Sequence, residues 1–409
     1  MRIAYLTGSF PRPSETFIVN QIAGVIEAGH DVDIYASARA SRGPYDPTIE
    51  RLDLMRRMRQ IEIPQRHFRR AATALGYIIR HGLWRRPDVL RRVLDFRSHG
   101  HHARNLSLLY TAMSFLNNPG YDLVHCQFGE IGARAVALKQ TRVITGQLVV
   151  SFRGADLSRT LKRHPSAYDN LFSQGDLFLP VSHAFKERLI ASGCPERKIR
   201  VLHSGIDVER FAMRPRVLEQ GQQVHLLSIG RLTPKKGFEF AIEAVAKLVK
   251  AGYPLKYTIL GDGALKRELE RRVAAHAVEP QIELAGWKHP GQVATYLNAA
   301  HVFLAPSITA DDGDAEGIPN VLKEAMATAM PVVSTVHSGI PELVEDGVSG
   351  LLAPERDVDA LSSCIARLVD RPDRWQDMGT AGRRRIEERF DIRALNRKLI
   401  ELYEQLLVV

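Results

Sequence analysis

The chain has 409 residues, of which 45% are hydrophobic and 25% charged, so we expect a globular protein with at least two domains. It contains no run of about 18 or more apolar residues, which excludes a membrane-spanning helix. The start, Met1–Gly8, turns polar too soon for a signal peptide. Three widely spaced cysteines indicate a reducing cytoplasm and argue against a disulfide framework or a zinc site.

The net charge of +10 is unevenly distributed. Residues 1–210 hold 31 Lys+Arg against 19 Asp+Glu, and residues 51–104 alone hold 14 Arg, interspersed with aromatic and aliphatic side chains. One interpretation is a solvated basic face. The other is a surface that meets anionic lipid or a lipid acceptor bearing a diphosphate. Nucleic acid is not favoured, because no nucleic-acid-binding module can be identified.

The N-terminal segment predicts the opening of a doubly wound α/β sheet. A strand over Arg2–Thr7 leads into a Gly/Pro-containing turn over 8–14, and Ser14 can cap a helix over 15–28 that ends at Gly29. A second strand follows over 31–36. In such sheets, ligands bind at the carboxyl ends of the strands.

Residues 40–110 read as a basic, helical insertion broken by prolines. Strands with following turns are then predicted over 122–129, 148–156 and 176–182, and Ser182 is suited to cap the next helix. The first domain is expected to end near residue 205, followed by a linker over 206–222, and the C-terminal helix near 390–409 is expected to return to it.

A second domain is predicted over 223–389. A strand over 224–230 is followed by the loop 231–237 and a helix over 238–250, which places Arg231 and Lys236 at a strand end beside a helix N-terminus, a suitable site for a diphosphate. The turn Gly261-Asp262-Gly263 lacks the third glycine of a dinucleotide fingerprint, so no nicotinamide site is expected.

The strongest motif lies between the predicted strands 301–306 and 331–334. A loop carries Glu316 and Gly317, and a helix follows, with Pro319 in its first turn and apolar residues at helical spacing through Ala329. Glu324 lies on this helix, so the spacing is Glu-x7-Glu. A further strand is predicted over 350–354 and helices over 357–389, broken at Pro372 and Gly379.

These motifs, Gly230-Arg231…Lys236-Gly237 and the stretch from Glu316 to Ala325, resemble the retaining family 4 glycosyltransferases, of the exopolysaccharide or colanic-acid type. The resemblance implies the GT-B architecture, in which two Rossmann-like doubly wound domains face an interdomain cleft. It implies that Arg231 and Lys236 contact the donor diphosphate, Glu316 the sugar and Glu324 the ribose. The other positions that it assigns to the donor are Gly8, Ser9, Gly261, Trp287, Gly317, Ile318, Pro319, Asn320 and Val321. It assigns Ser14, Glu15, Thr16 and Arg153 to the acceptor side.

Two positions depart from the family pattern. Where relatives have His-x-His, this chain has His125-Cys126-Gln127, and where they have Phe-His-Gly it has Phe152-Arg153-Gly154. Gln127 can bond a sugar hydroxyl but cannot carry a proton at neutral pH, so either Gln127 or His125 takes the catalytic role, unless His125 is simply buried and satisfied. Arg153 either faces an acceptor phosphate or pairs with Asp156.

The resemblance further implies a hexosyltransferase that retains anomeric configuration, needs no metal or cofactor, and uses a UDP- or GDP-sugar. Its acceptor would be a glycan or a polyprenyl-diphosphate-linked sugar in exopolysaccharide or lipopolysaccharide biosynthesis. The protein would be cytoplasmic or peripheral on the cytoplasmic face of the inner membrane. Retention allows same-face attack or a double displacement through Glu316. The alternatives are a soluble transferase making a small glycoside and a non-catalytic nucleotide-sugar-binding protein.

Overall fold

The computed structural model describes residues 1–12, 15–39, 46–64, 66–80, 82–97, 103–116 and 120–408. The chain forms two compact units. The first comprises Met1–Pro180, Lys186–Leu202 and Asn396–Val409, and the second comprises Val181–Phe185 and His203–Leu395. The C-terminal segment Asn396–Val409 thus belongs to the first unit.

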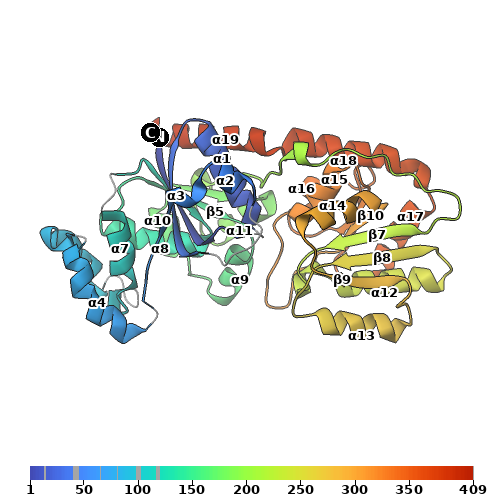
Figure 1. Cartoon of the computed structure of the whole chain (residues 1–409), viewed down its shortest axis with the longest axis horizontal. Coiled ribbons are helices and arrows are strands. Elements are labelled where there is room, and N and C mark those ends of the chain that lie inside the picture. Colours follow the sequence, from blue (N-terminus) through green and yellow to red (C-terminus); the bar gives the residue numbers. More distant parts are fainter. Residues whose placement is uncertain are drawn as a thin grey trace. The chain divides into compact units, whose positions relative to one another are not determined.

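The first unit is built on a parallel sheet, whose strand β5 is labelled in Figure 1. Its strand order is β3-β2-β1-β4-β5-β6. The strands are β1 Arg2–Phe10, β2 Asp31–Arg39, β3 Met58–Gln60, β4 Leu123–Gln127, β5 Gln147–Phe152 and β6 Leu177–Pro180. The direction of winding reverses between β1 and β4. A doubly wound sheet places its ligand site at such a switch point, at the carboxyl ends of the strands.

Two expectations for this sheet need correction. Gly8 and Ser9 do not lie in a turn, because β1 continues to Phe10 and Ser9 pairs with Ala38 of β2. The basic insertion is not wholly helical either, since it contributes the edge strand β3, which runs parallel to β2. Only three residues long, that strand offers too little periodicity to be distinguished in sequence.

The helices of the first unit largely match the predicted pattern. They are α1 Thr16–Glu27, α2 Thr48–Arg51, α3 Leu54–Arg57, α4 His67–Arg80, α5 Pro87–Val93, α7 Ser107–Leu116, α8 Gly129–Gln140, α9 Ala155–Arg163 and α10 Asp169–Gln174. Helix α11, His183–Ala191, is capped as predicted, because the Phe185 N–H donates to Ser182 Oγ at 3.1 Å. Ser14 lies outside the described residues, and α1 has Glu15 at its N-cap position.

The second unit repeats the design, with the parallel order β12-β11-β10-β7-β8-β9. Its strands are β7 Val224–Ile229, β8 Leu255–Leu260, β9 Ile282–Gly286, β10 Val302–Ala305, β11 Val332–Thr335 and β12 Leu351–Ala353. Here the switch point lies between β7 and β10. The predicted class, a doubly wound α/β protein, is therefore confirmed in both units.

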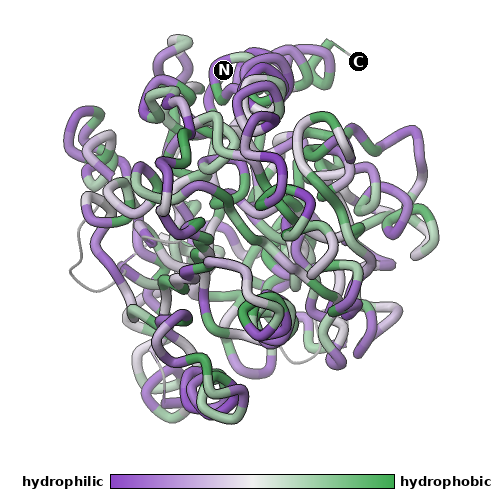
Figure 2. The backbone as a smooth tube through the Cα atoms, turned by 90° about the vertical axis from the view of Figure 1, so that its right-hand side faces the viewer, coloured by the Kyte–Doolittle hydropathy of each residue, from purple (hydrophilic) through white to green (hydrophobic). Residues whose placement is uncertain are grey.

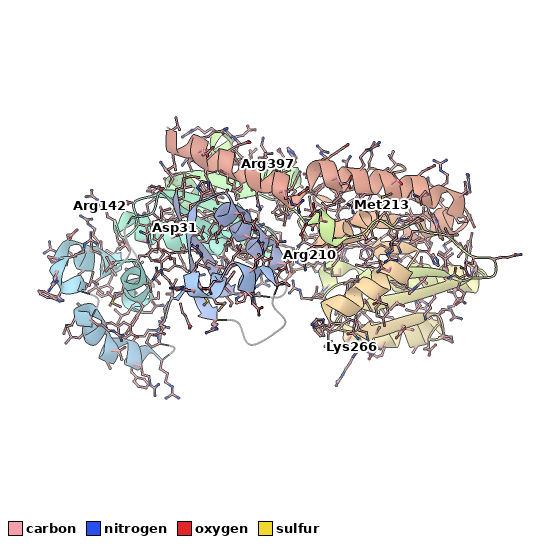
Figure 3. All side chains as sticks on the ribbon, turned by 45° about the horizontal axis from the view of Figure 1, so that its top comes forward. Asp31, Arg142, Arg210, Met213, Lys266 and Arg397 are labelled. Carbon is pink, nitrogen blue, oxygen red and sulfur yellow. The ribbon has the colours of Figure 1, made fainter. Side chains whose placement is uncertain are left out.

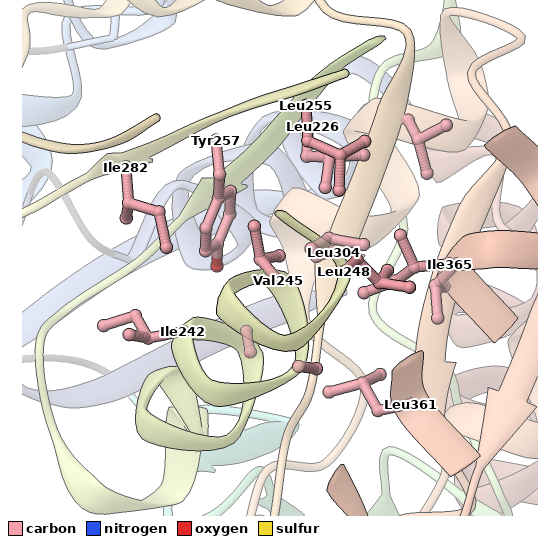
Figure 4. Close-up of a cluster of buried hydrophobic side chains, with 14 of the residues drawn as sticks. Leu226, Ile242, Val245, Leu248, Leu255, Tyr257, Ile282, Leu304, Leu361 and Ile365 are labelled. Carbon is pink, nitrogen blue, oxygen red and sulfur yellow. The ribbon is translucent and has the colours of Figure 1, made fainter. Parts of the chain in front are cut away.

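Helices cover both faces of this second sheet. They are α12 Phe238–Lys250, α13 Lys266–His276, α14 Pro290–Ala299, α15 Asn320–Ala327, α16 Ile340–Leu343, α17 Val358–Val369 and α18 Trp375–Arg389. Alternate strand residues enter opposite cores: Leu226 packs with α12 and α17 (Figure 4), whereas Leu227 packs with α15 and α18. Hydrophobic residues accordingly concentrate in the interior of the protein, and the outer helices contain both hydrophilic and hydrophobic residues (Figure 2).

Three details of the predicted helices were wrong. Pro319 has an extended backbone, with ψ 126°, and so precedes α15 instead of lying in its first turn. Ala329 has φ +58° and lies beyond the helix. Gly379 does not break α18 but lies inside the helix. A Cβ at this position would lie 2.0 Å from the carbonyl oxygen of Ala329, which explains why the helix has a glycine here. The last helix, α19, spans Ile392–Val408.

Candidate functional site

The loops after β7 and β10 meet at the switch point of the second sheet. The first contains a short 3-10 helix, Pro234–Lys236, and the Ile308 N–H after β10 donates to the Lys235 carbonyl at 2.9 Å. Gly237 has φ +63°, and a Cβ there would lie 2.0 Å from the Pro306 carbonyl oxygen. Only glycine allows the two loops to approach so closely.

This approach brings two lysines against the loop carboxylates. Lys236 Nζ lies 3.1 Å from Glu316 Oε1, while Lys235 Nζ lies 3.5 Å from Glu316 Oε1 and 3.2 Å from Asp314 Oδ1. Burial alone would raise the pKa of Glu316, but Lys236 and Lys235 outweigh it and lower that pKa from 4.5 to about 2. Glu316 is therefore an anion at physiological pH and accepts hydrogen bonds.

A buried histidine holds the backbone of Glu316. The Glu316 N–H donates to His337 Nε2 at 3.1 Å, which places the imidazole proton on Nδ1, 2.6 Å from Glu355 Oε1. Glu355 also accepts the Thr309 N–H at 2.7 Å. The pKa of Glu355 is lowered, because these hydrogen bonds and the His337 ring outweigh the burial that raises it.

Sequence reasoning missed four residues of this cluster: Lys235, Asp314, His337 and Glu355. The doubled lysine at 235–236 was a visible signal for the first. Asp314 lies two residues before Glu316 in an acidic stretch over 311–314, which by itself gives no signal for a contact with Lys235. His337 and Glu355 follow β11 and β12, so the rule that ligands gather at strand carboxyl ends could have pointed to them.

Glu324 and its neighbour Lys323 occupy one turn of α15. Burial raises the pKa of Glu324, and Lys323 and Arg210 partly oppose this. Lys323 is fully buried and donates to the Ser204 carbonyl, with its ammonium 5.9 Å from the centre of the Phe390 ring. Glu324 as a whole residue stays partly exposed.

The remaining donor-side positions are less closely grouped. Arg231 lies two residues beyond the end of β7 and is exposed, with no side-chain partner among the described residues. Trp287 is 63% exposed and lies edge-on to the His289 ring. Gly261 has φ +147°, and a Cβ there would meet the Gly230 carbonyl oxygen at 1.8 Å, so it holds the ends of β7 and β8 together. The carbonyl of Gly317, which begins the 317–321 stretch, accepts the Gly339 N–H.

In the first unit, His125 is fully buried on β4. Its Nδ1 lies 2.5 Å from the Tyr403 hydroxyl and its Nε2 lies 2.8 Å from Ser151 Oγ. Burial, with the nearby charge of Arg153, lowers the pKa of His125 well below 6.5, so the ring stays neutral. The position matches the buried and satisfied alternative, and both ring nitrogens are engaged.

Gln127 and Arg153 form a polar cluster with Gln21 of α1. Gln127 Nε2 donates to Gln21 Oε1 at 2.9 Å, and Gln127 Oε1 accepts from Arg153 Nη2 at 2.8 Å and Nε at 3.1 Å. Asp156 accepts backbone N–H groups from residues 129, 153 and 154. The expected alternative of an Arg153–Asp156 side-chain pair is therefore not formed, because the helix N-termini occupy that carboxylate.

The acceptor-side positions near the N-terminus are only partly described. Glu15 pairs with Arg12 at 3.0 Å, and Thr16 begins α1. Ser14 is outside the described residues. Within the described part of the chain, no group of three or more His, Cys, Asp or Glu side chains is arranged to hold a metal ion, and no helix is long and apolar enough to cross a bilayer.

Comparison with known proteins agrees with this arrangement. Residues 14–210 match the family model described as Glycosyltransferase Family 4, and residues 209–385 match Glycosyl transferases group 1. The chain is 37% identical to a protein of Salmonella typhimurium named as the colanic acid biosynthesis glycosyltransferase WcaL, over 99% of this chain and 100% of the relative. It is also 37% identical to the amylovoran biosynthesis glycosyltransferase AmsK of Erwinia amylovora, with the same coverage.

Solved structures show the same fold at low sequence identity. Anabaena HepE in complex with UDP aligns with a TM-score of 0.71 at 17% identity, covering 99% of this chain and 100% of that one. Sucrose-phosphate synthase of Thermosynechococcus elongatus aligns with a TM-score of 0.71 at 19% identity, covering 100% and 99%.

Proposed function

Because this chain belongs to glycosyltransferase family 4, we propose that it transfers a hexose from a nucleotide sugar with retention of configuration and without a metal or other cofactor. The observation that carries this proposal is the contact between Lys236 and Glu316 at the switch point of the second sheet. In this contact a fixed cation and a fixed hydrogen-bond acceptor are close enough to bind the same ligand. Both lie at the edge of the sheet where doubly wound sheets bind nucleotides.

The reaction moves negative charge onto the departing diphosphate. Lys236 and the exposed Arg231 lie at the carboxyl end of β7, where cations stabilise that charge. By analogy with the loss of one oxyanion donor, each cation contributes on the order of 2–4 kcal/mol to the lowering of the barrier. Glu316, held ionised by its two lysines, accepts hydrogen bonds from the donor sugar hydroxyls.

We favour same-face attack over double displacement. A nucleophilic carboxylate must approach the anomeric carbon, whereas Glu316 is engaged by Lys235 and Lys236 on the same oxygen, Oε1. Neither His125 nor Gln127 is exposed to accept the acceptor's proton, since both side chains are fully buried. The departing diphosphate is then the base that takes this proton.

The relatives' names suggest the acceptor class. Proteins named for colanic acid and amylovoran biosynthesis match along their whole length, so we propose a growing exopolysaccharide repeat, on a polyprenyl-diphosphate carrier, as the acceptor. The donor we propose is a UDP-sugar, by analogy with the UDP bound to HepE. Such an acceptor would place the enzyme at the cytoplasmic face of the inner membrane.

Helix α4 supports this peripheral position. One face of α4 carries Phe68, Leu75 and Ile79, which are 65%, 67% and 60% exposed. The opposite face is tied to the rest of the first unit, because Thr73 Oγ1 lies 2.6 Å from the Tyr110 hydroxyl. An apolar stripe beside many arginines suits the surface of an anionic bilayer.

The catalytic proposal is tested with a panel of UDP- and GDP-sugars. We expect UDP-sugars to raise the melting temperature, because ligands that bind only the folded state stabilise it. Lys236→Met should reduce nucleotide release in the presence of membrane acceptors by roughly 30-fold or more. The matched control Lys247→Met removes an exposed lysine of α12 and should change nothing. Normal turnover in Lys236→Met would contradict the assignment.

Membrane docking is tested separately by flotation. We expect the protein to float with phosphatidylglycerol-containing vesicles and less with phosphatidylcholine alone. The variant Leu75→Ser/Ile79→Ser should lose flotation, whereas Val348→Ser, an exposed apolar residue of the second unit, should keep it. Equal flotation of both variants would exclude α4 as the docking surface.

A further inference from the structure

The first unit contains a guanidinium whose charge no side chain of the cluster neutralises. Arg153 Nη2 donates to Gln127 Oε1 at 2.8 Å and to Gln21 Oε1 at 3.2 Å, and Nε donates to Gln127 Oε1 at 3.1 Å. Both partners are neutral amides. Among the described residues no carboxylate lies within ion-pair distance of this guanidinium. Burial lowers the pKa of Arg153 to about 10, and the more distant Asp156 and Glu15 only partly oppose this. Buried or half-buried cations are usually paired, so the arrangement requires another explanation.

Arg216 in the second unit shows how this fold uses a purely structural arginine. Its side chain is buried, Nη1 donates to the carbonyls of residues 297, 298 and 300 at 2.9 Å each, and Nη2 donates to Thr328 Oγ1 at 2.9 Å. Both terminal nitrogens of Arg216 are thus occupied. Arg153 differs in being partly exposed: its Nη1 has no partner among the described residues and is not buried, whereas the unpartnered Nε of Arg216 is buried.

The surroundings of Arg153 fix its orientation. The Phe17 ring covers one face of the guanidinium, with the Cζ atom 4.6 Å from the ring centre. Residue 153 directly follows β5, beside the carboxyl end of β4 and the switch point of the sheet. The N-terminal amides of α8 and α9 are already occupied by Asp156. The guanidinium is therefore a cationic donor that lies beside the switch point without an ion pair.

A second polar group points to a ligand at the same edge. Thr7 is 2% exposed, and its Oγ1 is buried without a hydrogen-bond partner among the described residues. Thr7 lies on β1 one residue beyond the Leu6–Cys126 pair, which places it beside Gln127. It lies on the same sheet face as Tyr5, whose ring lies 5.0 Å from that of His125. A buried hydroxyl left unpaired is costly, and a bound polar group would satisfy it.

We propose that Arg153, held in place by Gln21 and Gln127, binds an acidic group, a carboxylate or a phosphate, on the acceptor substrate. The proposal rests on the proposed function, because it assigns chemistry to that reaction's acceptor. The planar guanidinium edge matches either oxyanion, and neutral glutamines orient it without cancelling its charge. The acceptor is thereby predicted to be an acidic glycan, such as one containing a uronic acid, or a phosphate-bearing one.

The sharpest test introduces an internal anion. Gln21→Glu is nearly isosteric, and it keeps both hydrogen bonds, because Gln21 uses only its oxygen to accept from Gln127 and Arg153. The new carboxylate would pair with Arg153 and displace an external oxyanion. Arg153→Lys keeps the charge but loses the planar edge. Arg397→Gln removes an exposed arginine of α19, labelled in Figure 3, and serves as the matched control.

Binding is followed through the side-chain Nε–H resonance of Arg153 in ¹⁵N-arginine-labelled protein, assigned by its absence in Arg153→Lys. We expect methyl glucuronide or inorganic phosphate to shift this resonance, and methyl glucoside not to. Gln21→Glu should weaken that binding roughly tenfold or more, whereas Arg397→Gln should leave it unchanged. Methyl glucuronide alone would assign a carboxylate, and phosphate alone a phosphate.

Equal responses to the glucuronide and the glucoside would overturn the proposal, as would unchanged binding in Gln21→Glu. If only UDP shifts the resonance, Arg153 serves the donor and the proposal is also overturned. The donor is tested independently, through UDP binding and its dependence on Lys236. A chain that binds the glucuronide through Arg153 but binds no nucleotide would support the acidic site while counting against the proposed function.

Discussion

The contact between Lys236 and Glu316 predicts a strong energetic coupling. The folded state lowers the pKa of Glu316 from 4.5 to about 2 although burial raises it, so the ionised carboxyl stabilises the fold above pH 4.5 and loses that effect as the pH falls toward 2. The whole shift corresponds to about 3 kcal/mol. It is shared with Lys235, so we expect a coupling of about 1–2 kcal/mol between Lys236 and Glu316.

A double-mutant cycle of Lys236→Met and Glu316→Gln measures this coupling from urea unfolding. Trp375 is fully buried in the second unit and provides the fluorescence signal. We expect the coupling to be the same at pH 7 and at about pH 4, because a carboxyl with a pKa near 2 stays ionised at both. The exposed pair of Lys247 and Asp359 serves as control and should show little coupling.

Two results would refute this reasoning. A coupling that disappears at about pH 4 would mean that Glu316 titrates like an ordinary carboxyl. A coupling near zero at pH 7 would mean that the lysine and the carboxylate are each stabilised by solvent and not by one another.

Three further predictions concern the supporting residues. Gly261→Ala should destabilise the second unit by about 2–4 kcal/mol in urea unfolding, because the new Cβ would clash with the Gly230 carbonyl. The control Gly252→Ala should cost only about 1 kcal/mol, because Gly252 has φ +91° but open space around it. His337→Phe should cost about 1–3 kcal/mol and weaken UDP binding in a thermal-shift titration, because the Glu316 N–H and Glu355 lose their shared partner. Tyr403→Phe removes the hydroxyl that contacts His125 Nδ1 and should lower the free energy of unfolding by about 1 kcal/mol. Nucleotide release should be preserved, since His125 is structural. Loss of activity without loss of stability would instead indicate a catalytic role for His125.

Much of the fold could be predicted because the signals are local. Apolar runs marked the strands β7, β10, β11 and β12 of the second sheet, and the capping hydroxyl of Ser182 marked the start of α11. Failures occurred where tertiary contact overrides local preference. Gly379 looks like a helix break in the sequence. In the structure it lies inside α18, where it is required because a side chain at this position would clash with Ala329. Similarly, the pairing of β1 with β2 extends the strand through Gly8.

The candidate site divides in the same way. Lys236 and Glu316 could be predicted, because each belongs to a motif of residues that are close together in the sequence. His337 and Glu355 come from later strand ends and contribute through tautomer and hydrogen-bond geometry, which no spacing reveals. Arg153 was recognised as unusual, but its partners were not, because Gln21 lies on α1, 132 residues away in sequence.

Lys236 and Arg153 differ in their partners, and this difference has a chemical consequence. In the second unit Lys235 and Lys236 are balanced by Asp314 and Glu316, so an arriving diphosphate must share Lys236 with an existing partner. That sharing limits affinity for the ground-state donor and gains strength as charge accumulates on the leaving phosphate, which is where binding energy accelerates a reaction. In the first unit the Arg153 guanidinium donates hydrogen bonds only to neutral amides, so it gives up no ion pair when it binds. A group of that kind is suited to recognition, so we expect its loss to raise the KM for an acidic acceptor more than it lowers kcat, whereas loss of Lys236 should act mainly on kcat.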